Sequence, residues 1–141
     1  MALPAFPLRD LADVQTNFDD LDGRVEGLGR RGAWHQIGAA GEPAFQNSWA
    51  NYDTRVCRFY KDAGQRVHLV GFLQSGSTGT VCFTLPAGYR PVTGGTSGWL
   101  YAVVTNGGTG SIEVRSDGTV RVQSWGSTWV GLNGISFLAE A

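Results

Sequence analysis

The sequence is poor in charged residues. Only 16% of its 141 residues are Asp, Glu, Lys or Arg, and the formal net charge is −1. Lys61 is the single lysine, and the other basic residues are arginines. A chain without a net positive field is not expected to bind nucleic acid or acidic membranes through general electrostatic attraction. We therefore expect no nucleic-acid partner.

Long hydrophobic runs are also missing. No apolar run approaches the ~20 residues that a membrane-spanning helix needs. The first residues, 1–7, contain no basic region and are too short for a secretory signal peptide. We therefore expect synthesis in a cytoplasm, no membrane insertion, and release from the cell by a route such as lysis.

Residues that usually carry catalysis or bind metals are scarce. His35 and His68 are the two histidines, and no Cys/His pair has the spacing of zinc ligands. His68 alternates with apolar residues, which favours a core or interface residue over a general base. No nucleophile elbow or phosphate-binding loop occurs. The sequence therefore predicts no catalytic, cofactor-binding or metal-binding residues, and we expect that the protein is not an enzyme.

The two cysteines, Cys57 and Cys82, both fall in expected strands. Free cysteine is readily buried, so the favoured interpretation is a pair of buried free thiols. A disulfide between them is the alternative that the sequence leaves open.

One pattern near the N-terminus is regular. Apolar residues recur at alternating spacings of three and four along residues 11–28, namely Leu11, Val14, Phe18, Leu21, Val25 and Leu28. A repeat of about 3.5 residues is typical of a helix that packs against copies of itself in a coiled coil. We predict that these side chains form an oligomerisation seam in a coiled-coil helix and hinge at residues 11–32.

This helix is not expected to be stable alone. Gly23 and Gly27 lie off the seam, and each costs about 1 kcal/mol relative to alanine inside a helix. Gly29 and Gly32 follow and can end the helix. We therefore expect the next domain to hold the register of the helix.

Residues 1–10 are expected to be extended because they contain two prolines. One interpretation is an arm that docks on a larger assembly through Leu3, Pro4, Phe6 and Pro7. A disordered terminus is the other interpretation, and the sequence does not separate the two.

From residue 33 onward the apolar spacing changes to two, which is typical of strands. The connections between the runs are rich in glycine. About ten short strands at this spacing predict an antiparallel β-sandwich, jelly-roll-like, as a head domain at residues 33–141. The expected strands are Ala33–Ile37, Ala44–Phe45, Arg55–Lys61, Arg66–Leu73, Thr80–Leu85, Gly98–Thr105, Ser111–Arg115, Thr119–Trp125, Thr128–Val130 and Ile135–Ala139.

Two of these runs are especially informative. Asp117-Gly118 between two alternating runs predicts a hairpin, whose inward residues are Ile112, Val114, Val120 and Val122. The run Arg66–Leu73 is apolar on both faces, so we expect it to be a central strand covered on both sides.

Aromatic side chains offer the best candidates for binding. Trp125 and Trp129 flank a Gly-Ser-Thr turn, and Trp99 and Tyr101 share one strand face by their spacing. Such side chains can stack on sugar rings, so these four are possible glycan contacts. Packing in the core or between subunits is the alternative. We favour packing for Trp34, Trp49 and Trp99, while the two interpretations are balanced for Trp125 and Trp129.

Three short motifs resemble a known family. They are Trp49-Ala-Asn51, the strand Val67–Gly71 and the turn Leu85–Pro91, of which the last is the most specific. They resemble the C-terminal β domain of tailed-phage tail fibre and minor structural proteins, over residues 33–141. From the residues themselves, Pro86 and Gly88 should bend the turn, Tyr89 should pack beneath it, and Pro91 should stop the next segment from pairing.

The resemblance implies a homotrimer on the virion that often contacts a host surface. Trimer over dimer rests on this resemblance, because the heptad residues do not decide the number of helices. Our leading hypothesis is a tail-fibre or tail-tip protein that contacts host envelope polysaccharide. The alternatives are a capsid decoration or head-fibre protein docked through residues 1–10 and, third, a polysaccharide depolymerase with a site between subunits.

Overall fold

The computed structural model describes residues 31–92 and 98–140. The chain divides into a unit at Met1–Arg30 and a unit at Arg31–Ala141, and the described residues belong to the second. The predicted docking arm, coiled-coil helix and heptad seam therefore lie outside the described residues. Within those residues the structure contains eleven strands and no helix, which confirms the mainly β class.

The smaller sheet has four antiparallel strands in the order β1-β3-β4-β11. Alternation of buried and exposed residues places Phe59, Val67, Leu69 and Phe137 on its inner face. The strands are β1 (His35–Gln36), β3 (Arg58–Lys61), β4 (Arg66–Val70) and β11 (Ser136–Leu138).

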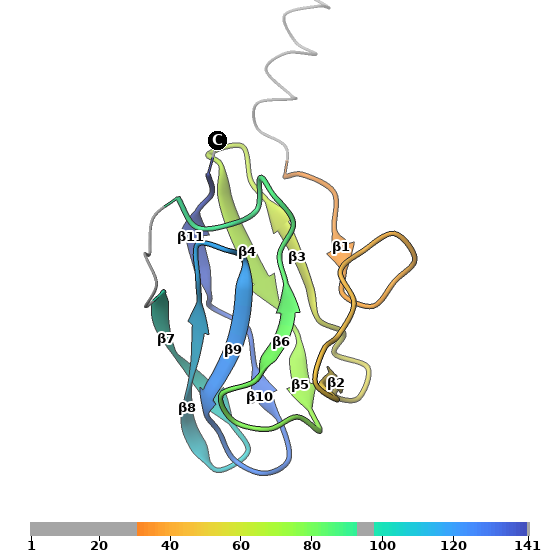
Figure 1. Ribbon diagram of the computed structural model, residues 1–141, viewed down its shortest axis with the longest axis vertical. Coiled ribbons are helices and arrows are strands. Elements are labelled where there is room, and N and C mark those ends of the chain that lie inside the picture. Colours follow the sequence, from red (N-terminus) through yellow and green to blue (C-terminus); the bar gives the residue numbers. More distant parts are fainter. Residues whose placement is uncertain (1–30, 93–97, 141) are drawn as a thin grey trace, which may run out of the picture. The chain divides into compact units, whose positions relative to one another are not determined.

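The larger sheet has seven antiparallel strands in the order β2-β5-β10-β7-β8-β9-β6. Its edges approach each other, because Gln46 N–H donates to the Cys82 carbonyl oxygen and the Trp49 indole donates to Thr80 Oγ1. The sheet therefore curls like half of a barrel (Figure 1). Its strands are β2 (Ala50–Asn51), β5 (Phe72–Gln74), β6 (Val81–Thr84), β7 (Trp99–Thr105), β8 (Gly108–Val114), β9 (Thr119–Ser124) and β10 (Val130–Gly131).

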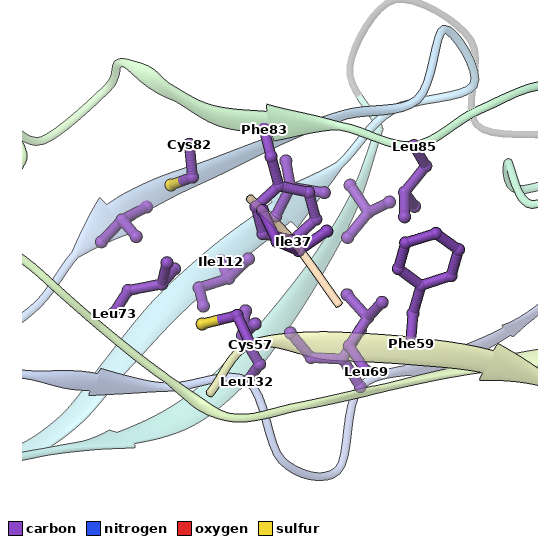
Figure 2. Packing of buried hydrophobic residues seen from close by; sticks show 14 of the residues in the cluster. Ile37, Cys57, Phe59, Leu69, Leu73, Cys82, Phe83, Leu85, Ile112 and Leu132 are labelled. Atoms are coloured by element: carbon purple, nitrogen blue, oxygen red, sulfur yellow. The ribbon is translucent and has the colours of Figure 1, made fainter. Parts of the chain in front are cut away.

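The inner faces of the two sheets enclose one hydrophobic core. Figure 2 shows Phe83 of β6 and the following Leu85 facing Phe59 of β3 and Leu69 of β4. The predicted hairpin at Asp117-Gly118 is confirmed as β8 and β9, and its inward residues are all fully buried. Beyond this hairpin the core also includes residues that do not alternate, such as the consecutive Cys82 and Phe83, and residues outside strands, such as Trp49 and Leu132.

The predicted strand Arg66–Leu73 is wrong as one element. The chain forms β4 up to Val70, breaks at Gly71, and continues as β5 in the other sheet. Gly71 has a φ of 114°, and a Cβ there would lie 2.7 Å from the Cys57 backbone nitrogen. Only glycine suits this position, because it tolerates a positive φ and leaves room for a neighbouring backbone. The run is apolar on both faces because it crosses from one wall of the core to the other.

Two short elements also differ from expectation. Ala44–Phe45 is not a strand in the structure, and Phe45 instead packs against the core from a loop. The sequence pattern missed β2, whose two residues pair with Leu73 and Gln74 of β5. Segments this short carry too few alternating residues to be recognised by period.

The turn Leu85–Pro91 closes one end of the core. Tyr89 N–H donates to the Pro86 carbonyl oxygen, and Arg90 Nε–H donates to the Leu85 carbonyl oxygen, so the turn is fixed locally. The expectation that Pro91 ends pairing is wrong. Pro91 bridges to Ala139, and Val92 N–H donates to the Leu138 carbonyl oxygen, because a proline accommodates pairing at a sheet edge.

Both ends of the described unit are held by the same turn between β3 and β4. Gly32 N–H donates to the Lys61 carbonyl oxygen at 2.7 Å, and Ala139 N–H donates to the Gln65 carbonyl oxygen at 2.8 Å. The loops β5–β6, β7–β8 and β9–β10 lie at the opposite end of the unit (Figure 1).

Candidate functional site

Trp125 and Trp129 lie on the loop between β9 and β10. Asn106 fixes this loop, since its Oδ1 accepts hydrogen bonds from the backbone N–H groups of Thr128 and Trp129. Trp125 packs at 5.1 Å against the buried Trp49, and it also lines a shallow hollow formed by residues 76–78 and 125–127. The lining of this hollow contains small and hydroxyl-bearing residues and no charged side chain.

Trp129 has a different environment. Its ring stacks on Phe72 of β5, with centroids 4.7 Å apart and an interplanar angle of 12°. The Arg55 guanidinium lies over the same Phe72 ring, 4.6 Å from its centroid. Arg55, Phe72 and Trp129 therefore form a ladder that joins three separate segments of the chain.

Trp99 and Tyr101 lie on β7, away from both tryptophans of the loop. Trp99 is 48% exposed at the start of the strand, while the end of β7 adjoins Asn106. At about 3.3 Å per residue, six residues of strand separate these ends by roughly 20 Å. The structure therefore does not bring the four predicted glycan contacts into one site.

Tyr101 is half-buried beside β11. Its hydroxyl donates to the Ser136 carbonyl oxygen at 3.2 Å, and burial raises the pKa of the phenol.

The sequence favours a packing role for Trp34 and Trp49. Trp49 is buried in the core, whereas Trp34 lies on the outside of the four-stranded sheet.

The outer face of the four-stranded sheet carries stacked aromatic rings and arginines. Trp34 packs edge-on against Tyr60 at 4.6 Å, and Tyr60 stacks on His68 at 4.8 Å. The Arg58 guanidinium lies 4.1 Å from the Trp34 centroid, and Arg31 covers the same ring at 4.9 Å. We call Arg31, Trp34, Arg58, Tyr60 and His68 the aromatic–arginine face.

Asp62 lies beside His68, at the end of the row of packed rings formed by Trp34, Tyr60 and His68. Its carboxylate accepts a hydrogen bond from His68 Nε2 at 2.8 Å and from the backbone N–H groups of Gly64 and Arg66. The bond from His68 is the main reason that the pKa of Asp62 lies below its ordinary value, and the backbone N–H groups add to it. His68 is thus satisfied on a half-buried surface, consistent with the expected structural role.

A depression adjoins the aromatic–arginine face. It has a volume of about 380 Å³ and lies where the chain crosses between the sheets at Gly71. Arg58 belongs to both surfaces. We call this hollow the arginine depression; its lining is Thr54, Arg55, Val56, Arg58, Val70, Gly71, Phe72 and Asn133.

Sequence reasoning missed these arginines. Arg55 and Arg58 were expected only as strand residues, and Asn133 lies more than sixty positions further along the chain. The sequence holds 12 acidic and 11 basic residues, so its composition gives no signal for an arginine-lined site. Arg55 and Arg58 are three positions apart, a spacing that does not place two residues on one strand face, and it does not show which distant residues join them.

A second polar cluster was also missed. His35 Nδ1 lies 3.0 Å from a Glu42 carboxylate oxygen, and His35 Nε2 lies 3.0 Å from the Tyr89 hydroxyl. A carboxylate, an imidazole and a hydroxyl are thus hydrogen-bonded in sequence, which is the arrangement of an acid–base relay. Its rings also stack on Phe59, so the cluster ties β1 to the turn Leu85–Pro91 and has a structural role in closing the core.

The cysteines are buried and free. They enter the core from opposite walls (Figure 2), and the structure contains no disulfide between them. Burial raises the pKa of the Cys57 thiol far above its ordinary value and that of Cys82 to about 12. Thiols held in the neutral form are poor nucleophiles and poor metal ligands. Residues 31–92 and 98–140 contain no cluster of His, Cys, Asp and Glu that could hold a metal ion.

Exposed apolar side chains gather on one side of the unit. Leu100 and Val104 on β7 are 65% and 63% exposed, and Ala102 between them is exposed as well. All the large apolar side chains that are exposed in the described residues lie on β7, on β11 or on Val92, which bonds to β11; they are Val92, Trp99, Leu100, Val104 and Leu138.

The edge of β7 is also only partly paired. β7 pairs with β8 along its whole length, from Trp99 to Thr105. On its other side the described strands pair with it at one position, Thr105 with Val130 of β10. We call this part of the surface the β7 edge.

Comparisons with models of protein families, with curated proteins and with solved structures find no match. Among the described residues, no helix is long and apolar enough to cross a membrane. The assignment of function therefore rests on the residues and their geometry.

Proposed function

We propose that the protein is a structural protein of a bacteriophage virion. It forms a homotrimer on the particle surface, with a coiled-coil stalk at residues 11–32 and a β-sandwich head of jelly-roll type. As a tail-fibre or tail-tip protein, it contacts host envelope polysaccharide through the head. The heptad pattern supports the stalk, and the resemblance of the head motifs supports the trimer and the virion.

The observation that carries the oligomer is the β7 edge. Soluble monomers normally protect sheet edges with charges, prolines or covering segments, because unpaired edges associate. Here Leu100 and Val104 are exposed beside an edge that pairs at a single position in the described part of the chain. Burying one large aliphatic side chain contributes about 1.5–3 kcal/mol. Contact between copies at this edge supplies the stabilisation that the heptad helix, with two glycines, lacks.

Contact with a polysaccharide is supported by the polar surfaces of the head. The hollow beside Trp125 offers an aromatic edge and hydroxyl groups, and the arginine depression offers hydrogen-bond donors beside Phe72. Aromatic rings with nearby donors suit sugars, whose ring faces are apolar and whose rims are polar.

Sedimentation equilibrium of the full chain tests the oligomer. We expect a mass three times that of the 15.1 kDa chain at micromolar concentration. A stable monomer under these conditions would contradict the proposal, and a dimer would remove the support that the resemblance gives to the trimer.

Immunogold labelling of phage particles that carry the protein tests its position. An antibody raised against the head should label the tail tip or tail fibres. Label spread over the capsid would instead favour the decoration protein docked through residues 1–10. The absence of label from purified particles would exclude a virion role.

A further inference from the structure

The arginine depression is lined by hydrogen-bond donors and contains no acidic side chain. Arg55, Arg58, Asn133 and Thr54 line it, and their side chains carry two guanidinium groups, an amide and a hydroxyl. A guanidinium has only donors, and two of them in one hollow leave positive charge without a partner of opposite sign. A ligand that fits this lining must bring acceptors and negative charge.

The guanidinium groups are held in place by aromatic rings. Arg55 lies 4.6 Å from the centroid of Phe72, and Arg58 lies 4.1 Å from that of Trp34. A guanidinium that stacks on a ring keeps its N–H groups in the plane, where they remain able to donate. Within residues 31–92 and 98–140, neither arginine forms an ion pair with a carboxylate. Both are therefore ordered by stacking and available to an anion.

Asn133 is oriented by the backbone. Its Oδ1 accepts a hydrogen bond from Gly71 N–H at 2.9 Å, at the point where the chain crosses between the sheets. The acceptor side of the amide is thus occupied, which leaves its NH₂ group to donate. Asn133, which is held at the crossing by Gly71, therefore adds a neutral hydrogen-bond donor to the two arginines.

Phe72 supplies an apolar surface within the same hollow. Its ring is backed by Trp129, which stacks on it with centroids 4.7 Å apart. The Arg55 guanidinium lies over the same ring, so Phe72 offers an apolar edge, and not a free ring face, beside the charged donors. An apolar edge next to charged donors suits an organic molecule that carries an oxyanion.

We propose that the arginine depression binds the acidic group, carboxylate or phosphate, of an acidic polysaccharide. The oxyanion accepts hydrogen bonds from Arg55 and Arg58, with Asn133 and Thr54 completing its shell, while the carbon atoms of the sugar pack beside the edge of Phe72. This inference rests on the proposed contact with host polysaccharide and names its chemical class. It differs from the hollow beside Trp125, which has no charged lining and suits neutral sugars.

Binding of the full chain to immobilised polysaccharides tests the inference by surface plasmon resonance. Polygalacturonate carries the carboxylate, its methyl ester has the same backbone without the charge, and poly(glycerol phosphate) carries the phosphate. We expect binding to one or both acidic polymers and at least about tenfold weaker binding to the ester. Raising the salt concentration should weaken the acidic interaction, because two charged contacts are screened.

Matched variants locate the site. Arg55→Gln combined with Arg58→Gln should weaken binding to the acidic polymer by about tenfold or more. Arg66→Gln removes the same charge from an exposed arginine of β4 that does not line the depression, and it should change binding less than about twofold. A cooperative thermal transition and an unchanged oligomer mass would show that the variants fold.

Three results would overturn the inference. They are binding to the ester that is as strong as binding to either acidic polymer, equal effects of the depression and Arg66 variants, and no binding to either acidic polymer at low salt. Binding of the ester that is lost on Trp125→Ala would assign sugar contact to the neutral hollow. These outcomes differ from failure of the proposed function, which appears as a monomer or as the absence of the protein from particles.

Discussion

Two outer surfaces of the head differ in how their side chains are satisfied. On the four-stranded sheet, Trp34, Tyr60 and His68 stack on one another and Asp62 accepts a hydrogen bond from His68. On β7, Leu100 and Val104 project into solvent beside an edge that pairs only at Thr105 among the described strands. Among the described residues, the side chains of the first surface have partners, whereas Leu100 and Val104 of the second are exposed.

This difference indicates how each surface can be used. A surface whose aromatic and charged groups are already ordered can meet a polar ligand with little loss of conformational entropy. An apolar surface beside an open edge gains free energy chiefly by removal from water. The two proposals follow this difference: a ligand at the arginine depression, which adjoins the first surface, and contact between copies at the β7 edge.

The substitution with the largest expected effect is Gly71→Ala, because it destabilises the fold that carries both surfaces. Gly71→Ala places a Cβ against the backbone of Val56 and Cys57 at a φ of 114°. We expect a loss of about 3–5 kcal/mol in the free energy of unfolding, measured by urea denaturation. Gly79→Ala is the control, because Gly79 also has a positive φ but its Cβ would meet no atom within 4 Å. The Gly79→Ala variant should lose only about 1–2 kcal/mol of unfolding free energy. Equal losses in the two variants would show that the close approach of the neighbouring backbone at Gly71 is not the cause.

The next prediction tests whether oligomerisation through β7 and ligand binding are independent. Leu100→Lys with Val104→Lys should convert the oligomer to monomer at micromolar concentration, because two apolar contacts worth about 1.5–3 kcal/mol each are replaced by charge. Sedimentation velocity measures this change, and binding to an acidic monosaccharide such as glucuronate, followed by NMR, should survive it. Gln36→Lys with Ala63→Lys adds the same charge at exposed sites elsewhere and should leave the mass unchanged. An oligomer that tolerates the first pair of substitutions would place its interface outside β7.

A smaller effect measures how firmly the ordered surface is held. A double-mutant cycle with Arg58→Gln and Trp34→Leu should give a coupling energy of about 0.5–1 kcal/mol, as for an exposed cation–π pair. Thermal or urea unfolding of the four proteins supplies the values. A coupling near zero would mean that Arg58 is not ordered by the ring.

The smallest effect is a dependence of stability on pH. Hydrogen bonds from His68 and two backbone N–H groups lower the pKa of Asp62 in the folded protein. Its contribution to stability is therefore present above the unfolded pKa of about 3.9 and is lost as the pH falls through the lower folded value. Asp62→Asn should flatten this part of the curve when unfolding is followed from neutral to acidic pH. A curve identical to that of the original chain would contradict this origin.

Local patterns predicted the hairpin of β8 and β9 and its buried face correctly. Ile112, Val114, Val120 and Val122 alternate around Asp117-Gly118, so the buried face follows from neighbouring residues. Such features need no information about distant parts of the chain.

Features that depend on distant contacts could not be predicted. The pattern Arg66–Leu73 gave one strand, although the glycine inside it was a sign of a break. The arginine depression gathers residues from three segments, and His35 meets Tyr89 from 54 positions away. Alternation tells which side of a sheet a residue occupies, but the neighbours across sheets are set by how the whole chain folds.

The turn between β3 and β4 holds both ends of the described unit. Gly32 and Ala139 bond to residues 61 and 65, so the chain enters and leaves at one end of the head. The loops β5–β6, β7–β8 and β9–β10 at the opposite end can therefore be lengthened or exchanged without moving the points of attachment. The described unit is therefore suited to the grafting of foreign loops at the end that carries β5–β6, β7–β8 and β9–β10.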